Sequence, residues 1–261
     1  MTMWHSDPSR WSNRMKYTVE ICCGSYYDGV QAILGGAKRI ELNSALHMGG
    51  LTPSIAHLRM LKQNFDCTVI TMARVRGGGF CYNQLDKEAM FADVALLLEN
   101  GADGIAFGFL DEQGNIDTES SRKMIEFIHS AGKQAVFHRA FDCCSDPYRA
   151  IEQLVELQAD RILTSGGKPT AQEGKQLIKE LQMRYGNQIE LLAGSGINET
   201  NAKEIITDCG ITQIHSSCKC WISDPTTISA NVSYAYASAE FSDCYDAVDQ
   251  AKVKALINSI Q

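Results

Sequence analysis

The chain has 261 residues, of which 44% are hydrophobic and 21% charged, and its formal net charge is −7. This is the composition of an ordinary soluble globular protein, and its acidic balance argues against nucleic acid or an anionic membrane as a bulk partner, because phosphate-rich partners select basic surfaces. No apolar run approaches the roughly 18 residues that a membrane span needs. The length permits two small domains or one α/β barrel.

The amino-terminal segment and the ten cysteines bear on where the protein acts. Residues 1–14 contain Trp4 and Trp11 but no apolar stretch of a secretory signal. We therefore expect residues 1–15 to be a disordered lead-in, or Met15 to be an alternative start. A chain of this length without a signal peptide is expected in the reducing cytoplasm, with its cysteines as free thiols.

Strand-like and helix-like segments alternate along the whole chain. The expected strands are Tyr17–Cys22, Arg39–Asn43, Thr68–Arg74, Gly104–Gly108, Gln134–His138, Arg161–Thr164, Glu190–Ala193 and Gln213–Ser216. The expected helices are Asp28–Leu34, Ser54–Gln63, Lys87–Glu99, Glu119–Ser130, Pro147–Leu157, Ala171–Arg184, Glu199–Thr207 and Asp246–Ser259. Ser54, Asp146 and Asn198 precede helices as caps, and glycines follow several helices where a left-handed residue ends the last turn.

Eight strands that each precede a helix predict parallel pairing with crossover helices, and in about 250 residues they predict a single (β/α)8 TIM-like barrel over residues 16–261. A doubly wound open sheet is the alternative, but Cys22-Cys23-Gly24-Ser25 lacks the spaced glycines of a dinucleotide site. Residues 218–245 are polar without clear periodicity, and we expect them to wrap the barrel mouth.

Ionisable residues gather at the carboxyl ends of the predicted strands, where barrels carry their function. Side chains two residues apart share a face of a strand, so these residues can meet in the mouth. Salt bridges inside the barrel would explain any one of them, but burying the whole set is costly unless the groups are used. The candidates for acid–base chemistry are Glu20, Glu41, His138, Asp142 and His215, with His138 and Asp142 as a possible acid–base pair.

Small residues follow the last three strands and indicate an anion site. In such barrels, phosphate groups bind to backbone amides of the loops after strands seven and eight. Glycines also serve simply to turn a strand tightly into a helix, and that alternative stays open. The candidate ligand-binding residues are Arg74, Arg76, Arg139, Ser165, Gly166, Gly194, Gly196, Ser216 and Ser217.

The thiols offer few metal sites. Adjacent cysteines on a strand point to opposite faces, and no repeated Cys-x-x-Cys is present, so a structural zinc site is not expected. Soft Cu(I) tolerates a looser set of thiolates. Cys22 is the first candidate metal ligand, with Cys218 and Cys220 as weaker ones.

Seven motifs in order give the chain a resemblance to the CutC copper-homeostasis family. They are Val19-Glu20-Ile21-Cys22, Arg39-Ile40-Glu41-Leu42, Gly49-Gly50-Leu51-Thr52-Pro53-Ser54, Arg74-x-Arg76-Gly77-Gly78-x-Phe80-x-Tyr82, Phe137-His138-Arg139-Ala140-Phe141-Asp142, Leu163-Thr164-Ser165-Gly166 and His215-Ser216-Ser217. The resemblance implies a TIM-like barrel, a cytoplasmic homo-oligomer (dimer or tetramer) and a role in Cu(I) binding or trafficking. No reaction is established for the family that it resembles.

One departure bears on copper. Cys22 matches the first thiol of the family's copper proposal, but Asn43 stands where a second Cys is usual. The first hypothesis is therefore a copper-homeostasis protein that binds Cu(I) through Cys22. The alternative is a barrel enzyme of lyase, isomerase or hydrolase type, or a sensor, that takes a small anionic, phosphorylated metabolite into the charged mouth.

Overall fold

The computed structural model describes residues 17–261, and the expectation of a lead-in over residues 1–15 lies outside the described residues. Within the described part, no helix is both long and apolar enough to cross a membrane.

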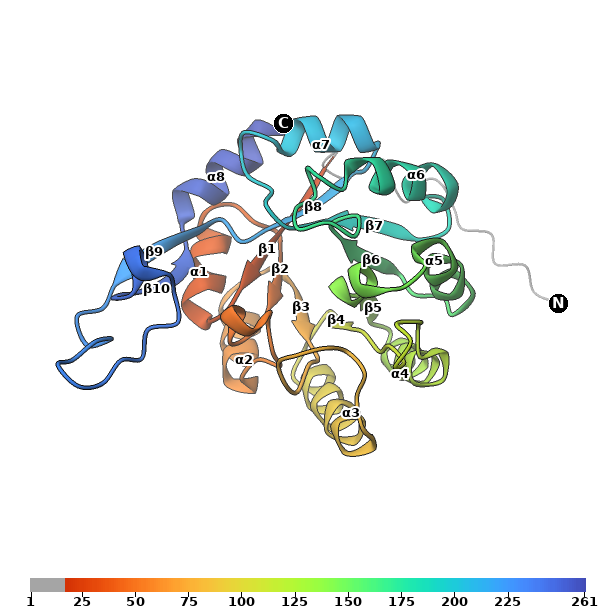
Figure 1. The fold of residues 1–261 in the computed structure, drawn as a ribbon, viewed down its shortest axis with the longest axis horizontal. Coiled ribbons are helices and arrows are strands. Elements are labelled where there is room, and N and C mark those ends of the chain that lie inside the picture. Colours follow the sequence, from red (N-terminus) through yellow and green to blue (C-terminus); the bar gives the residue numbers. More distant parts are fainter. Residues whose placement is uncertain (1–16) are drawn as a thin grey trace.

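Eight parallel strands close into a barrel in chain order, with helices around the outside (Figure 1). The barrel strands are β1 (Thr18–Cys23), β2 (Arg39–Leu42), β3 (Thr68–Met72), β4 (Gly104–Phe107), β5 (Gln134–Phe137), β6 (Arg161–Thr164), β7 (Glu190–Ala193) and β8 (Gln213–Ser216). The helices are α1 (Tyr26–Leu34), α2 (Ile55–Asn64), α3 (Gln84–Glu99), α4 (Thr118–Ser130), α5 (Pro147–Glu156), α6 (Lys175–Tyr185), α7 (Ala202–Cys209) and α8 (Gln250–Ser259). The predicted (β/α)8 barrel is confirmed.

Closure of the barrel determines which strands are adjacent at its mouth. β1 lies between β2 and β8, and its register places Cys22 opposite Glu41 and Glu20 opposite His215. Residues far apart in the sequence thereby become adjacent, and the polar ends of these three strands face the same space.

The apolar core has two parts of different character. A large cluster fills the layer between the strands and the helices, with Ile21, Leu42 and Phe107 fully buried there. Inside the barrel the apolar cluster is small: Ile70, Met72, Ala106 and Val136. Buried polar residues take up further space there, which is why charged groups reach the centre of the molecule.

Two of the three predicted helix caps are confirmed. The side chains of Ser54 and Asp146 accept hydrogen bonds from backbone amides in the first turns of α2 and α5, as N-cap residues do. Asn198 is not a cap: α7 begins three residues later than expected, with Asn201 in the N-cap position.

The predictions for the segment near the carboxyl end were wrong in part. Residues 246–248 were expected in the last helix but belong to strand β10 (Cys244–Val248), which pairs antiparallel with β9 (Lys219–Ser223). The last helix begins only after Asp249, whose carboxylate caps it. The segment is therefore partly ordered as a two-stranded sheet beside the barrel, drawn in blue in Figure 1.

α6 also begins later than expected. Residues 171–174 form turns before the helix, because Gly166 and Gly174 bring two backbone segments into close contact there.

Candidate functional site

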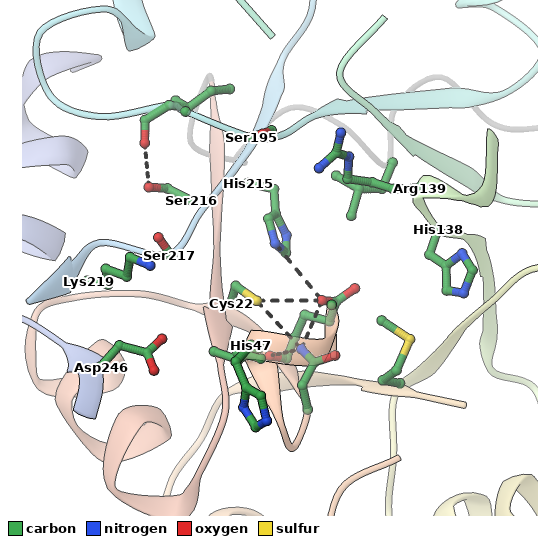
Figure 2. A pocket seen from close by; sticks show the side chains of 18 of the residues that line it. Cys22, His47, His138, Arg139, Ser195, His215, Ser216, Ser217, Lys219 and Asp246 are labelled. Atoms are coloured by element: carbon green, nitrogen blue, oxygen red, sulfur yellow. Dashed lines mark hydrogen bonds and ion pairs between the residues drawn. The ribbon is translucent and has the colours of Figure 1, made fainter. Parts of the chain in front are cut away.

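A cavity of about 540 Å³ opens at the carboxyl ends of the strands. Its lining comes from the barrel strands, the loops after β2, β7 and β8, and the β9–β10 sheet (Figure 2). A cavity of this size in this position is typical of a small-molecule or cofactor site.

The floor of the cavity carries a thiol, an imidazole and a carboxylate in one cluster. The side-chain donor atoms of Cys22, Glu41 and His215 all lie within 4.8 Å of one another. The Glu41 Oε2 atom lies 3.9 Å from Cys22 Sγ and 3.9 Å from His215 Nε2. Three donors of different type that converge on one point form a potential metal site.

Glu20 orients the imidazole of this cluster. The His215 Nδ1–H donates to Glu20 Oε1 at 2.9 Å, and Arg39 Nε contacts the other carboxylate oxygen at 2.7 Å. This arrangement turns His215 Nε2 toward Cys22 and Glu41, as a carboxylate behind a metal-binding histidine does.

The electrostatics of this buried pair favour the ionised carboxylate. Burial by itself raises the pKa of Glu20, but the charge of Arg39 and the hydrogen bond and charge of His215 outweigh it and lower this pKa to about 2. Burial disfavours the charged imidazole, yet the hydrogen bonds and negative groups around His215 outweigh burial and raise its pKa well above the ordinary value. His215 and Glu20 thus form an ion pair at neutral pH.

The other two members of the cluster hold their protons more tightly than usual. Burial raises the pKa of the Cys22 thiol, and the charges of Glu41 and Glu20 add to the effect. Burial also raises the pKa of Glu41, whose Oε1 atom is buried without a hydrogen-bond partner in the described structure. A metal ion at this point would displace protons and give Glu41 a partner.

Asn43 contacts two members of the cluster, Cys22 and Glu41. Its Nδ2 atom donates to Glu41 Oε2 at 3.0 Å and lies 3.6 Å from Cys22 Sγ. An amide is a poor ligand for Cu(I), so Asn43 acts here as a hydrogen-bond donor that positions the carboxylate and the thiol.

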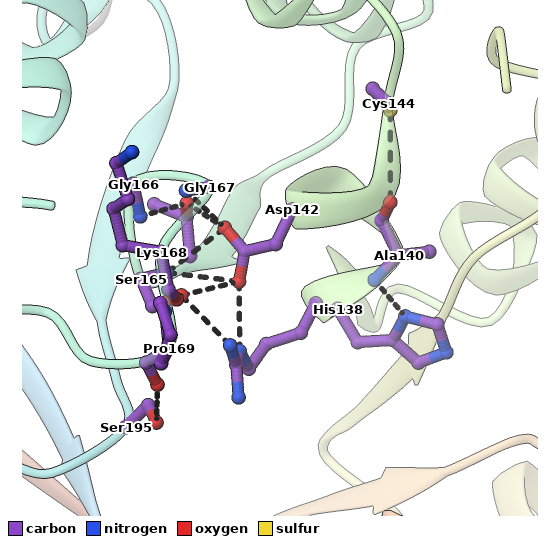
Figure 3. Close-up of polar contacts among 12 residues, drawn as sticks. His138, Ala140, Asp142, Cys144, Ser165, Gly166, Gly167, Lys168, Pro169 and Ser195 are labelled. Carbon is purple, nitrogen blue, oxygen red and sulfur yellow. Dashed lines mark hydrogen bonds and ion pairs between the residues drawn. The ribbon is translucent and has the colours of Figure 1, made fainter.

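His138 and Asp142 do not form the expected acid–base pair (Figure 3). The Nδ1 atom of His138 accepts a hydrogen bond from the Ala140 amide at 3.1 Å, while Asp142 accepts from Arg139 Nε at 2.8 Å. Burial and the charge of Arg74 lower the pKa of His138 to about 3, so its imidazole is neutral at physiological pH.

Asp142 serves as an anchor for the loop after β6. Its carboxylate accepts hydrogen bonds from Thr164 Oγ1, the Ser165 amide and the Gly167 amide (Figure 3). The same oxygens hold Arg139, whose Nη2 atom donates to Ser165 Oγ at 2.8 Å. Ser165 and Gly166 therefore belong to the support of the site and not to the cavity lining.

The two arginines after β3 have separate surroundings. Arg74 lines the cavity and is buried, with hydrogen bonds to the carbonyl oxygens of Met48, Gly50 and Gly78. Arg76 lies outside the lining and pairs with Asp86 at 2.8 Å. The structure thus brings only one of the two to the mouth.

Of the remaining expected ligand-binding residues, some line the cavity and others do not. Gly196, Ser216 and Ser217 line the cavity, whereas Gly194 does not. Ser216 Oγ donates to the Ile197 carbonyl and thereby joins the loops after β7 and β8. Ser195 also lines the cavity, in a left-handed conformation with φ of 78°.

The weaker thiol candidates are not part of the cluster. Cys218 is buried beside Ser216 Oγ, and Cys220 contacts the carbonyl oxygen of Ala247. Among residues 17–261, neither groups with Cys22 as a potential metal ligand.

Sequence reasoning treated His215 and Glu41 as acid–base candidates and not as metal ligands. Their proximity to Cys22 could have been predicted, because β8 must lie beside β1 in a closed barrel and residues two apart on a strand share a face. Residues 218–245 were expected at the mouth, and Lys219, Trp221 and Tyr236 of that segment do line the cavity. The sequence did not single out these side chains, nor Asp246, because the segment has no periodicity from which the strands β9 and β10 could be predicted.

The fold and the site define a (β/α)8 barrel with a thiol–imidazole–carboxylate cluster at its mouth. Residues 17–220 match the CutC family, and the chain belongs to that family. The residues after Cys220, including most of the β9–β10 sheet, lie outside the match.

Individual proteins of the CutC family are similar to this chain in sequence and in structure. A CutC family protein of Treponema denticola is 43% identical over 221 residues, covering 85% of this chain and 89% of the relative. The human protein named copper homeostasis protein cutC homolog is 40% identical over 203 residues, covering 78% of this chain and 74% of the relative. The crystal structure of the CutC protein of Streptococcus agalactiae matches with a TM-score of 0.71 at 32% identity, covering 77% of this chain and 98% of that one.

Proposed function

We propose that this protein acts in copper homeostasis by binding Cu(I) in the barrel mouth, with Cys22 Sγ and His215 Nε2 as ligands. The observation that carries the proposal is the convergence of Cys22, His215 and Glu41 within 4.8 Å at the floor of an open cavity. The names of the human and mouse relatives point to the same metal.

The donor set suits Cu(I) even without a second cysteine. Thiolate and imidazole are both good ligands for this ion, and Cu(I) accepts two or three ligands. Glu41 is a harder donor, and its place beside Cys22 suits it to receive the proton that the thiol gives up. Glu20 keeps the metal-binding nitrogen of His215 turned toward the thiol.

The thiol must be reduced to bind Cu(I), and we therefore propose that the protein works in the reducing cytoplasm. The homo-oligomer that the family resemblance implies stays a prediction, which light scattering on the purified protein tests directly.

The test is an anaerobic titration of the metal-free protein with Cu(I) against a chromophoric chelator. We expect one Cu(I) per chain, with binding weakened at least about tenfold in Cys22→Ser and in His215→Gln. Cys143→Ser is the matched control, because that exposed thiol lies outside the cavity and its loss should leave the affinity unchanged. Equal affinity in the wild type and in Cys22→Ser would exclude this site.

A further inference from the structure

The cavity above the cluster is much larger than a metal ion requires. A bound water molecule occupies about 30 Å³ of liquid volume, whereas the cavity measures about 540 Å³. Cys22, Glu41 and His215 form its floor, and other side chains line the open space above them (Figure 2). A copper ion at the floor would leave most of the cavity to another molecule.

Lys219 gives the cavity a positive charge without a fixed partner. The residue lies at the start of β9, and Figure 2 shows its side chain extending into the cavity. Among the described residues, its ammonium group forms no ion pair and lies 4.9 Å from the centre of the Trp221 ring. Lys219 is exposed, so this cation lies at the open rim of the cavity, where a positive charge attracts an anion.

Arg139 adds a guanidinium group that is already held in place. Its Nε atom is fixed by Asp142 and its Nη2 atom by Ser165, yet 42% of its side chain remains exposed. In Figure 2 it lies on the other side of His215 from Lys219. Because the fork is immobilised beforehand, a ligand that meets it loses little side-chain entropy on binding.

A third cation, Arg74, lines the cavity from a buried position. Arg74 is buried, and its hydrogen bonds go to carbonyl oxygens; in the described part of the chain it forms no ion pair. A buried guanidinium without a counter-ion is costly, and an anion in the adjacent cavity reduces that cost.

Two loops of the rim contain residues in strained backbone conformations. Ser195 and Cys218 are non-glycine residues with positive φ, of 78° and 42°, in the loops after β7 and β8. Left-handed conformations of this kind cost free energy and concentrate at binding sites. Ser216 and Ser217 bring hydroxyl groups to the same rim.

We propose that the cavity binds a small organic oxyanion, a carboxylate or a phosphate ester, between Arg139 and Lys219 and above the Cys22–His215–Glu41 cluster. Asp246 and Glu41 line the same space, so the uncharged part of the ligand carries hydroxyl donors that face these carboxyl groups. This inference goes beyond copper binding, because neither Arg139 nor Lys219 belongs to the metal cluster.

The experiment uses full-length, metal-free protein and two sets of probes. The first set contains inorganic phosphate and glycerol 3-phosphate, and the second contains malate and citrate. We expect a saturable rise in Tm and measurable heat of binding with members of one set, which distinguishes a phosphate ligand from a carboxylate ligand.

Three variants locate the binding. Lys219→Gln and Arg139→Gln should each weaken it about tenfold, the loss expected from one charge-assisted hydrogen bond. Lys254→Gln is the control, because that lysine is exposed on α8 and lies outside the cavity. Should Arg139→Gln fail to fold, Lys219→Gln decides alone, since Lys219 lies on the outer sheet and anchors no loop through its side chain.

The proposal is overturned if no probe of either set binds at millimolar concentration, or if binding is equal in the wild type and in Lys219→Gln. Cys22→Ser separates this inference from the copper proposal, because that variant should lose Cu(I) affinity and keep the anion affinity.

Discussion

Replacing Glu20 with Gln tests whether the buried ion pair behind the cluster supports the site. Glu20 is 1% exposed and contacts Arg39 and His215 at 2.7 and 2.9 Å. Gln keeps the size of the side chain and removes its charge, so it leaves a guanidinium and an imidazolium without their counter-ion. The change therefore perturbs electrostatics and leaves the packing almost intact.

The magnitude follows from the pKa of Glu20. Its pKa lies at about 2 and the ordinary value is 4.5, and a depression of that size corresponds to about 3 kcal/mol of stability at neutral pH. Removing one partner of a buried pair costs about 3–5 kcal/mol in general, which agrees. Because the folded-state pKa is the lower one, this stabilisation is present above pH 4.5 and is lost as the pH falls toward 2.

Urea unfolding at neutral pH, followed by circular dichroism, measures the effect. We expect Glu20→Gln to lower the free energy of unfolding by about 3 kcal/mol, and we expect the difference from wild type to shrink in acid. Glu119→Gln is the matched control: Glu119 pairs with Lys123 on the surface with its side chain 79% exposed, so its loss should change stability far less than the loss of Glu20. Equal effects of the two substitutions would refute the electrostatic argument.

Three further predictions concern the cluster and the loops that support it. Cu(I) affinity should rise with pH, by about tenfold per pH unit for each proton displaced. The reason is that the pKa values of Cys22 and His215 are both raised and Cu(I) binds only their deprotonated forms. Competition titrations at several pH values measure the affinity, and an affinity that does not change with pH contradicts the prediction. Asn43→Cys should bind Cu(I) at least about tenfold more tightly than wild type, because Asn43 Nδ2 lies 3.6 Å from Cys22 Sγ and the variant would place a second thiolate there. An equal Cu(I) affinity of variant and wild type in competition with a chelator would count against the assigned geometry. Gly174→Ala should lower the free energy of unfolding by more than about 2 kcal/mol, because its Cβ would lie 1.9 Å from the Ser165 carbonyl oxygen. Gly79→Ala, whose Cβ would have nothing within 4 Å, should change the free energy of unfolding little. Thermal and urea unfolding of the two variants measure the difference.

The sequence predicted the barrel well because its signals are local and repeated. Alternating apolar strands and capped helices follow from short-range patterns, and the residues at Ser54 and Asp146 behave as their types suggest. The end of the chain was harder. Residues 246–248 lie directly before α8, and their pairing with β9 makes them a strand, while the cap at Asp249 marks where the helix begins.

The candidate site was predicted as a set of residues and not as an arrangement. Strand alternation correctly brought Cys22, Glu41 and His215 to the mouth, but it could not show which groups meet. His138 and Asp142 lie four residues apart and have different partners, because the 3₁₀ turn Arg139–Cys143 directs Asp142 toward the loop after β6. Arg76 is likewise held outside by Asp86 on α3, a contact that no spacing rule contains.

The most direct test of the central claim is X-ray absorption spectroscopy of the protein loaded with one Cu(I) per chain. The account predicts one sulfur and one imidazole nitrogen as the principal ligands of the copper, with the sulfur lost in Cys22→Ser and the imidazole lost in His215→Gln. A copper environment that is the same in the wild type and in both variants would contradict it.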